Sequence, residues 1–448
     1  MIKLSFSRRV LAAGTAAIVL ALAGCSGSYD PPSETVISPP PDLAIVRDAI
    51  DRVQASYVQP VDTKKLLKDA LKGMLGGLDA HSDYMDDKEF KDLLAQTRGR
   101  FAGIGAELSR DDNKIKVISP IDDTPAARAG VRAGDIISRI NGQATEELSL
   151  TEVVDKLRGA VDTNVTLTLD RAGEKSFDVT LTRAVIHVVS VKSQLRPGRI
   201  GYARITTFNE NTQQELLKAL DGIQRDAGRP LKGFVLDLRN DPGGVLEAAI
   251  EVAGNFLDGG VVVSTRGRDE DDNQIFQSNG RDLLKGVPMV VLINGASASA
   301  SEIVAGALQD RRRATIVGTQ SFGKGSVQSI LPLDGGNGAL RLTTALYYTP
   351  AGRSIQGEGI TPDEVVASPP SDRAGRRLLH EADLRNAFKN PNAKKDEAVP
   401  TEGNKAETDV PIDSVSIGTE KDVQLTVAVK RLEEMARAQQ SQTPEKRG

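Results

Sequence analysis

The chain has 448 residues, of which 39% are hydrophobic and 26% charged, and its formal net charge at pH 7 is −4. This length predicts two or three domains, and the acidic balance without a basic stripe argues against a nucleic-acid-binding protein. Because the three histidines have no metal-ligand spacing and the chain has one cysteine, we expect no metal site, no cofactor and no internal disulfide.

The first 24 residues predict an export signal. Lys3, Arg8 and Arg9 form a positive segment, and the apolar run 10–22 that follows is shorter than a membrane-spanning helix requires. The run ends in Leu22-Ala23-Gly24-Cys25, which resembles the processing site of bacterial lipoproteins. We therefore expect a lipid anchor on Cys25 and a periplasm-facing position in the cell envelope, on either membrane. A thiol without a function is the alternative for Cys25.

Two segments precede the first compact domain. Residues 25–42 are rich in proline and serine, which predicts a flexible stalk. Residues 43–98 carry apolar side chains at helical spacing, which predicts an N-terminal helical segment.

Residues 99–185 predict a compact, β-rich module. Polar and apolar side chains alternate from Val165 to Leu169, as in a half-buried strand. The centre of the module, 129–142, resembles that of a PDZ domain. That resemblance implies a groove in which a substrate C-terminus adds as an edge strand, its carboxylate held by successive loop N–H groups. The residues implied are Gly103, Ile104, Gly105 and Ala106 in the loop and Val154 on a helix over 150–157. An inert β domain with a glycine turn is the alternative.

Strands and helices alternate through residues 186–370, which predicts a layered α/β core. Strands are expected at Arg199–Ile205, Gly233–Leu238, Val287–Ile293, Thr315–Gly318 and Leu340–Tyr347. Helices are expected at Thr212–Arg225, Leu246–Phe256 and Ser301–Gln309. Within this core we expect Arg204, Asp237 and Arg239 to form buried ion pairs, and substrate contacts are the alternative.

Residues 371–448 predict a linker followed by a helix. The stretch 389–413 is polar and charged, which is typical of disorder. From Asp422 to Arg437 apolar side chains return at helical spacing, as a stripe that could serve dimerisation.

A serine-rich turn stands between the predicted strand ending at Ile293 and the helix that follows. Hydrolases expose a nucleophile at such a strand-to-helix turn, and Ser297, Ser299 and Ser301 all qualify by chemistry. Because no histidine lies nearby, the candidate base is a lysine whose pKa is lowered by burial. The alternative is a helix cap, since Ser299 and Glu302 have the spacing of a capping box.

Seven ordered motifs between residues 43 and 366 resemble those of the C-terminal processing peptidases, which are serine–lysine endopeptidases with an embedded PDZ domain. The motifs are Gly73–Ser82, Gly103–Leu108, Gly201–Glu210, Asp237–Gly244, Ser297–Asp310, Phe322–Gly325 and Tyr348–Ile355. The resemblance implies a crotonase-like α/β core with an inserted PDZ domain. It also implies protein substrates with apolar C-termini, and it allows a homo-oligomer and an adaptor protein as partners.

Carried over position by position, the resemblance places the nucleophile on Ser299 and the base on Lys324. Gln328 then holds the amine, and it shares a face with Lys324 if the segment is helical. Glu302 also matches, and we expect it to act first as a structural cap.

The same resemblance assigns the oxyanion donors to backbone N–H groups, namely that of Ala300 and those of the pair Gly243 and Gly244. A glycine turn after Pro242 is the alternative for the pair. The histidines His81, His187 and His380 are expected to have no catalytic role.

Two other functions compete with the membrane-tethered endopeptidase. One is a PDZ scaffold, or an adaptor-dependent protein with little turnover of its own, although the intact Ser299, Lys324 and Gln328 argue against it. The other is an acyl-CoA enzyme of the crotonase type, which the export signal disfavours.

Overall fold

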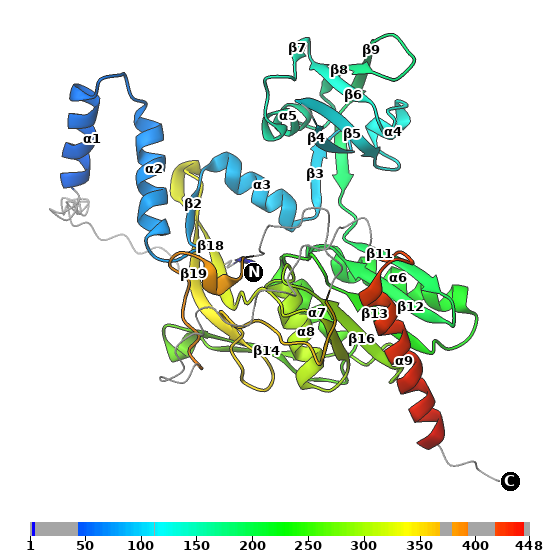
Figure 1. The fold of residues 1–448 in the computed structure, drawn as a ribbon. Helices are drawn as coiled ribbons and strands as arrows, with labels where there is room; N and C mark the ends of the chain where they lie inside the picture. The colour runs from blue at the N-terminus through cyan, green and yellow to red at the C-terminus, as the bar shows by residue number, and fades with distance from the viewer. Residues whose placement is uncertain (1, 5–43, 112, 368–378, 393–416, 443–448) are drawn as a thin grey trace, which may run out of the picture.

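The computed structural model describes residues 2–4, 44–111, 113–367, 379–392 and 417–442. N-terminal helices, a small β domain and an α/β core follow one another along the chain (Figure 1). Cys25, nearly all of the predicted export signal and stalk, and most of the predicted linker 389–413 lie outside the described residues. Among the helices of the described residues, none is long and apolar enough to span a membrane.

In the central sheet of the α/β core, the inner strands are short and largely apolar, and their side chains are buried on both faces, whereas the two edge strands are more exposed. In sheet order the strands are β11 (Val191–Arg196), β12 (Ile200–Ile205), β13 (Gly233–Asp237), β16 (Met289–Ile293), β17 (Thr315–Gly318) and β20 (Glu364–Val365). Strands β12 to β20 run parallel, and β11 is an antiparallel edge. Each strand predicted for this region is present, with its ends shifted by at most two residues.

Three helices cover one face of this sheet. They are α6 (Thr212–Ala227), α7 (Leu246–Gly254) and α8 (Ala300–Asp310), and all three were predicted. Their apolar side chains join Phe234 and Leu236 of β13 in one buried cluster. Because side chains alternate along a strand, Val235 points to the opposite face.

Helix α9 (Val423–Gln442) covers that opposite face. Leu425 and Leu432 are buried against the sheet, so the stripe expected to serve dimerisation is used at least in part inside the molecule. The helix is also fixed by an ion-pair cluster, in which the guanidinium of Arg239 lies 2.5 Å from Asp237 and 2.6 Å from Asp422. Asp237 and Arg239 thus have the structural role expected of them.

A second sheet lies beside the first and carries the segment after the candidate base. Its strands are β1 (Ile2–Leu4), β18 (Ser326–Pro332), β19 (Ala339–Tyr348), β14 (Gly260–Gly267), β15 (Gln274–Ser278) and β2 (Asp83–Met85), which pairs with β19. Short 3₁₀ turns occur at η2 (Glu270–Asp272), η3 (Asp334–Gly336) and η4 (Glu381–Asp383).

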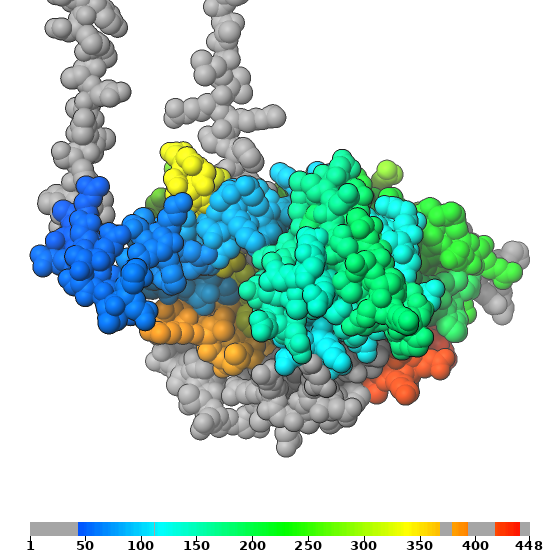
Figure 2. Space-filling view, turned by 90° about the horizontal axis from the view of Figure 1, so that it is seen from above, coloured from blue at the N-terminus to red at the C-terminus, as the bar shows by residue number. Residues whose placement is uncertain are grey.

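The N-terminal part is helical apart from β2. Its helices are α1 (Ala44–Ser56), α2 (Thr63–Gly76) and α3 (Asp87–Thr97). A two-stranded stem, β3 (Arg100–Gly103) with β10 (Ala184–His187), then leads into and out of the β domain. Seen from above, this domain and α3 lie side by side over the core, while α1 and α2 lie at the edge (Figure 2).

The β domain has its own hydrophobic core. Its sheet contains β4 (Ala106–Asp111), β5 (Lys114–Pro120), β6 (Ile136–Ile140), β8 (Asn164–Asp170) and β9 (Phe177–Thr182), and β7 (Gln143–Ala144) pairs with β6. Helices α4 (Pro125–Arg128) and α5 (Leu150–Leu157) pack against this sheet. The predicted α/β core with an inserted β-rich domain is confirmed.

Candidate active site

The three candidate serines, at the turn between β16 and α8, differ in the hydrogen-bond partners of their hydroxyls. Ser297 Oγ donates to the Leu238 carbonyl at 2.8 Å, and Ser301 Oγ donates to the Asp241 carbonyl at 3.0 Å. Both hydroxyls therefore hold the turn in place. The Ser299 hydroxyl is buried and has no hydrogen-bond partner among the described residues. Of the three, Ser299 alone is left for chemistry.

The backbone at Ser299 supports that assignment. Its φ is +56° and its ψ is −110°, which is a strained conformation for a residue with a side chain. Such strain persists only where the surroundings enforce it, and it is common at catalytic positions.

Glu302 supplies much of that enforcement. Its fully buried carboxylate accepts hydrogen bonds from the N–H groups of Ser299 (2.7 Å) and Lys324 (2.9 Å). It also accepts from the Gly323 N–H (2.6 Å) and the Ser321 hydroxyl (2.5 Å). Burial raises the pKa of Glu302 to about 7, although the four hydrogen bonds act to lower it. Glu302 thus caps α8, as expected. It also connects the serine turn, residues 294–299, to residues 321–325, the loop that carries Lys324 and is called the lysine loop below.

Tyr347, on β19 of the second sheet, also contacts the backbones of both Ser299 and Lys324. Its buried hydroxyl lies 2.5 Å from the Lys324 carbonyl and 3.3 Å from the Ser299 carbonyl. Burial lowers the pKa of Lys324, and the positive charge of Arg341 acts in the same direction. Glu302 and Tyr347 therefore both contact the backbones of Ser299 and Lys324, and the pKa of Lys324 is shifted in the direction that a general base requires.

Gln328 lies on β18, so the segment is not helical and the condition under which Gln328 would share a helix face with Lys324 is not met. Its amide nitrogen donates to Ser326 Oγ at 3.0 Å and reaches Thr343 Oγ1 at 3.4 Å. The segment pairs with β19 along its whole length, and this pairing decides its conformation. That Gln328 holds the Lys324 amine stays a prediction.

The glycine loop after β13 packs directly on the candidate nucleophile. A Cβ on Gly243 would lie 2.9 Å from Ser299 Cβ, and one on Gly244 would collide with the Phe208 carbonyl. The Gly243 N–H donates to Asp241 Oδ1 at 2.8 Å and is therefore occupied. The N–H groups of Gly244 and Ala300 have no acceptor among the described residues, so they are the candidate oxyanion donors.

The predicted peptide groove belongs to the β domain, which stands apart from the α/β core (Figure 1). The Gly105 carbonyl accepts from the Ile121 N–H, and the Ile104 carbonyl accepts from the Ala126 N–H, both at 2.9 Å. Ile104 has a buried side chain, so only its backbone can contribute to a carboxylate-binding loop with Gly103 and Ala106. Val154 on α5 is half-buried at the domain surface.

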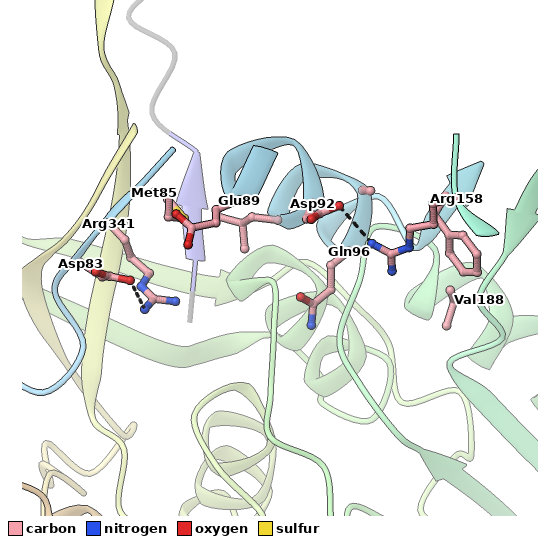
Figure 3. Close-up of a pocket in the computed structure, with 11 residues that line it drawn as sticks. Asp83, Met85, Glu89, Asp92, Gln96, Arg158, Val188 and Arg341 are labelled. Atoms are coloured by element: carbon pink, nitrogen blue, oxygen red, sulfur yellow. Dashed lines mark hydrogen bonds and ion pairs between the residues drawn. The ribbon is translucent and has the colours of Figure 1, made fainter. Parts of the chain in front are cut away.

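A cavity of about 450 Å³ lies between the PDZ domain and the second sheet (Figure 3). Its lining comprises Asp83, Met85, Glu89, Asp92, Leu93, Ala95, Gln96, Phe101, Arg158, Val188 and Arg341. Two of these lining residues are hydrogen-bonded to each other, with the Arg158 guanidinium donating to the Asp92 carboxylate at 3.0 Å. Sequence reasoning missed this space, because its lining comes from segments that only the fold brings together.

Three protein-family models match parts of the chain. A family model described as peptidase family S41 matches residues 199–366, and a PDZ domain model matches 116–171. A model of the N-terminal domain of the activating protease CtpB matches 26–89.

Several curated proteins are similar to the chain. A carboxy-terminal-processing protease of Bartonella bacilliformis is 53% identical over 351 residues, which cover 78% of this chain and 80% of that protein. The carboxy-terminal processing protease CtpA of Bacillus subtilis is 35% identical, over 70% of this chain and 66% of that protein.

Among solved structures, the photosystem II D1 C-terminal processing protease is 30% identical, covering 73% of this chain and 93% of that one at a TM-score of 0.43. The match to the Bartonella protein, together with the family model, shows what the chain is. The chain belongs to peptidase family S41, as a carboxy-terminal-processing, serine-type peptidase with a PDZ domain.

Proposed function

We propose that this peptidase cleaves protein substrates with a Ser299–Lys324 dyad after its PDZ domain has captured their apolar C-termini. The observation that carries the dyad is the shared anchoring of both residues by Glu302 and Tyr347, next to an unpaired serine hydroxyl.

The reaction follows from these positions. Neutral Lys324 accepts the Ser299 proton as the serine oxygen attacks the scissile carbonyl. The Gly244 and Ala300 N–H groups stabilise the oxyanion. The lysine ammonium then gives the proton to the leaving amine, and an acyl-enzyme remains. Water, deprotonated by the same lysine, hydrolyses the ester and restores the free serine.

Capture would occur on the PDZ domain. A terminal carboxylate at the loop Gly103–Ala106 would accept backbone hydrogen bonds, and the apolar residues before it would pack beside Val154. The hydrogen bonds to the Ile104 and Gly105 carbonyls support this, because they fix the orientation of the loop peptides.

We also propose that the protein is exported and anchored by a lipid on Cys25. The sequence pattern Leu22–Cys25 supports this location. Intact mass of the purified membrane-fraction protein tests it. A chain that begins at Cys25 and carries acyl chains is expected, whereas an unprocessed or unmodified chain would contradict it.

The dyad is tested on the full-length chain purified in detergent, with an unfolded substrate that ends in apolar residues. Ser299→Ala and Lys324→Ala should each abolish cleavage as followed by intact mass. Ser193→Ala and Lys232→Ala, which change exposed residues, are the matched controls and should cut normally. Undiminished turnover by either dyad variant would refute the dyad, and binding without cleavage by the unaltered protein would favour a PDZ scaffold.

A further inference from the structure

Three polar side chains from distant parts of the chain meet beside the lysine loop. His81 Nε2 lies 2.8 and 3.0 Å from the two carboxylate oxygens of Glu381, which is 300 residues further along the chain. Gln356 Nε2 donates to Glu381 Oε1 at 2.9 Å. The side chains of Glu381 and Gln356 are fully buried. Burying a carboxylate is costly unless it is well paired, so this cluster is a defined feature of the fold.

The cluster holds the backbone on both sides of Lys324. Gln356 Oε1 accepts from the Gly325 N–H at 2.9 Å, and the Gly357 N–H donates to the Gly323 carbonyl at 2.8 Å. The peptide groups before and after Lys324 are therefore both fixed by one short segment.

Glu381 adds a third attachment to the same loop. Its backbone N–H donates to the Phe322 carbonyl at 3.0 Å, while its carboxylate is held by His81 and Gln356. The buried carboxylate of Glu381 thus links His81, in the N-terminal part of the chain, to the loop that carries Lys324.

Glu381 also acts on Lys324 by charge. The charged side chains that act on the pKa of Lys324 belong to different elements: Arg341 to β19, Glu302 to α8 and Glu381 to η4. Burial and Arg341 favour the neutral amine, whereas the two carboxylates favour the ammonium form. Among the described residues, the charged or titratable group in contact with Glu381 itself is His81, whose Nε2 lies 2.8 Å from the carboxylate.

We propose that Glu381, held in place by His81 and Gln356, is a positioning residue for Lys324 and acts on the amine both through the loop backbone and through its charge. The proposal rests on the role of Lys324 given under the proposed function. If Glu381 only stabilised the fold, its replacement would leave the titration of Lys324 unchanged. A titration of Lys324 therefore distinguishes a structural role of Glu381 from a positioning role.

The test is a direct titration of Lys324 that does not depend on peptidase activity. In full-length Ser299→Ala protein, the rate of Nζ acetylation by acetic anhydride is followed against pH by peptide mass spectrometry. Glu381→Gln keeps the size of the side chain and an oxygen acceptor but removes the charge. Because the carboxylate favours the ammonium form, its loss should move the labelling midpoint down by roughly 0.5 pH unit or more.

Two control variants separate charge from disturbance of the loop. Glu364→Gln removes a glutamate on β20 that is not among the charges acting on Lys324, and it should leave the midpoint in place. His81→Gln leaves the Glu381 charge present, so the midpoint should not fall. A fall in His81→Gln equal to that in Glu381→Gln would mean that a loosened loop, not charge, is the cause, and would overturn the proposal.

The activity profile completes the test with Ser299 restored. The acid limb of kcat/KM should move down in Glu381→Gln in step with the labelling midpoint. An unchanged midpoint in a variant that is folded by circular dichroism would overturn the proposal. A midpoint that moves while the acid limb stays fixed would confirm the action of Glu381 on Lys324 and refute Lys324 as the base.

Discussion

The PDZ domain and the α/β core use their polar groups in opposite ways. In the core, Glu302 is fully buried and binds both the serine turn and the lysine loop. On the PDZ domain, the candidate groove consists of backbone groups and the half-buried Val154. Bond cleavage requires groups held in one geometry, whereas capture of varied C-termini requires an accessible surface. The predictions below test whether this division of labour holds.

The largest expected effect concerns the buried amine. Lys324→Met should lower kcat/KM by about 10³-fold, within the range for loss of a general base, and yet raise the free energy of unfolding. Because the pKa of Lys324 is lowered in the folded chain, folding with the ammonium form is unfavourable. This cost is full below the folded pKa and disappears as pH rises toward 10.5, the ordinary value. Urea unfolding at several pH values should therefore show a stability gain that shrinks with rising pH.

Unfolding of the exposed variant Lys232→Met provides the comparison for Lys324→Met. A Lys324 variant that is less stable than the unaltered protein at pH 6 would show that the lysine stabilises the core, and the contrast drawn above would fail.

Glu302→Ala should have the next largest effect. It leaves the N–H groups of Ser299, Gly323 and Lys324 and the Ser321 hydroxyl without their acceptor. Unpaired buried donors cost about 1–3 kcal/mol each before relaxation, so we expect a loss of about 3–5 kcal/mol in the free energy of unfolding and at least a 100-fold loss in kcat. Chemical denaturation and steady-state cleavage measure both. Glu302→Gln retains one acceptor and should lose less; equal losses in the two variants would contradict the capping role.

Val154→Arg should affect capture and spare chemistry. A charged side chain in an apolar groove should raise KM for a substrate with an apolar C-terminus by about tenfold, which corresponds to about 1.4 kcal/mol. The kcat value at saturation should change less than twofold. Ile118→Arg, at another exposed apolar position of the same domain, is the matched control and should leave KM unchanged. A fall in kcat for Val154→Arg alone would show that occupancy of the groove activates the core.

Much of the fold was readable from the sequence. Strands such as β13 and β17 are short apolar runs between turn residues, and α8 follows its strand after a serine turn, so local patterns were sufficient. The positions of Ser299 and Lys324 followed from the resemblance to the peptidase family. The structure separated Ser299 from Ser297 and Ser301, because only their hydrogen-bond partners distinguish three serines of the same chemistry.

The misses have a common physical cause. The segment after Lys324 is a strand because β19 pairs with it, and a spacing of four residues fits a strand as well as a helix. His81 was expected only to have no catalytic role, and no sequence pattern indicated its contact with Glu381, because that contact depends on the fold bringing residues 300 positions apart together. Neither pairing leaves a periodic signal in the sequence, so no local pattern could have indicated it.

The smallest expected effect lies at the boundary between the two regions. Arg158 and Asp92 pair at 3.0 Å between the PDZ domain and α3, and both side chains are more than a third exposed. Exposed ion pairs contribute about 0–1 kcal/mol, so Arg158→Gln should change the unfolding midpoint only slightly. If the PDZ domain only captures substrate, kcat for a short peptide without an apolar tail should also stay within twofold of the unaltered value. A tenfold change in that kcat would mean that the boundary contact controls the catalytic core, and the two regions would then act as one unit.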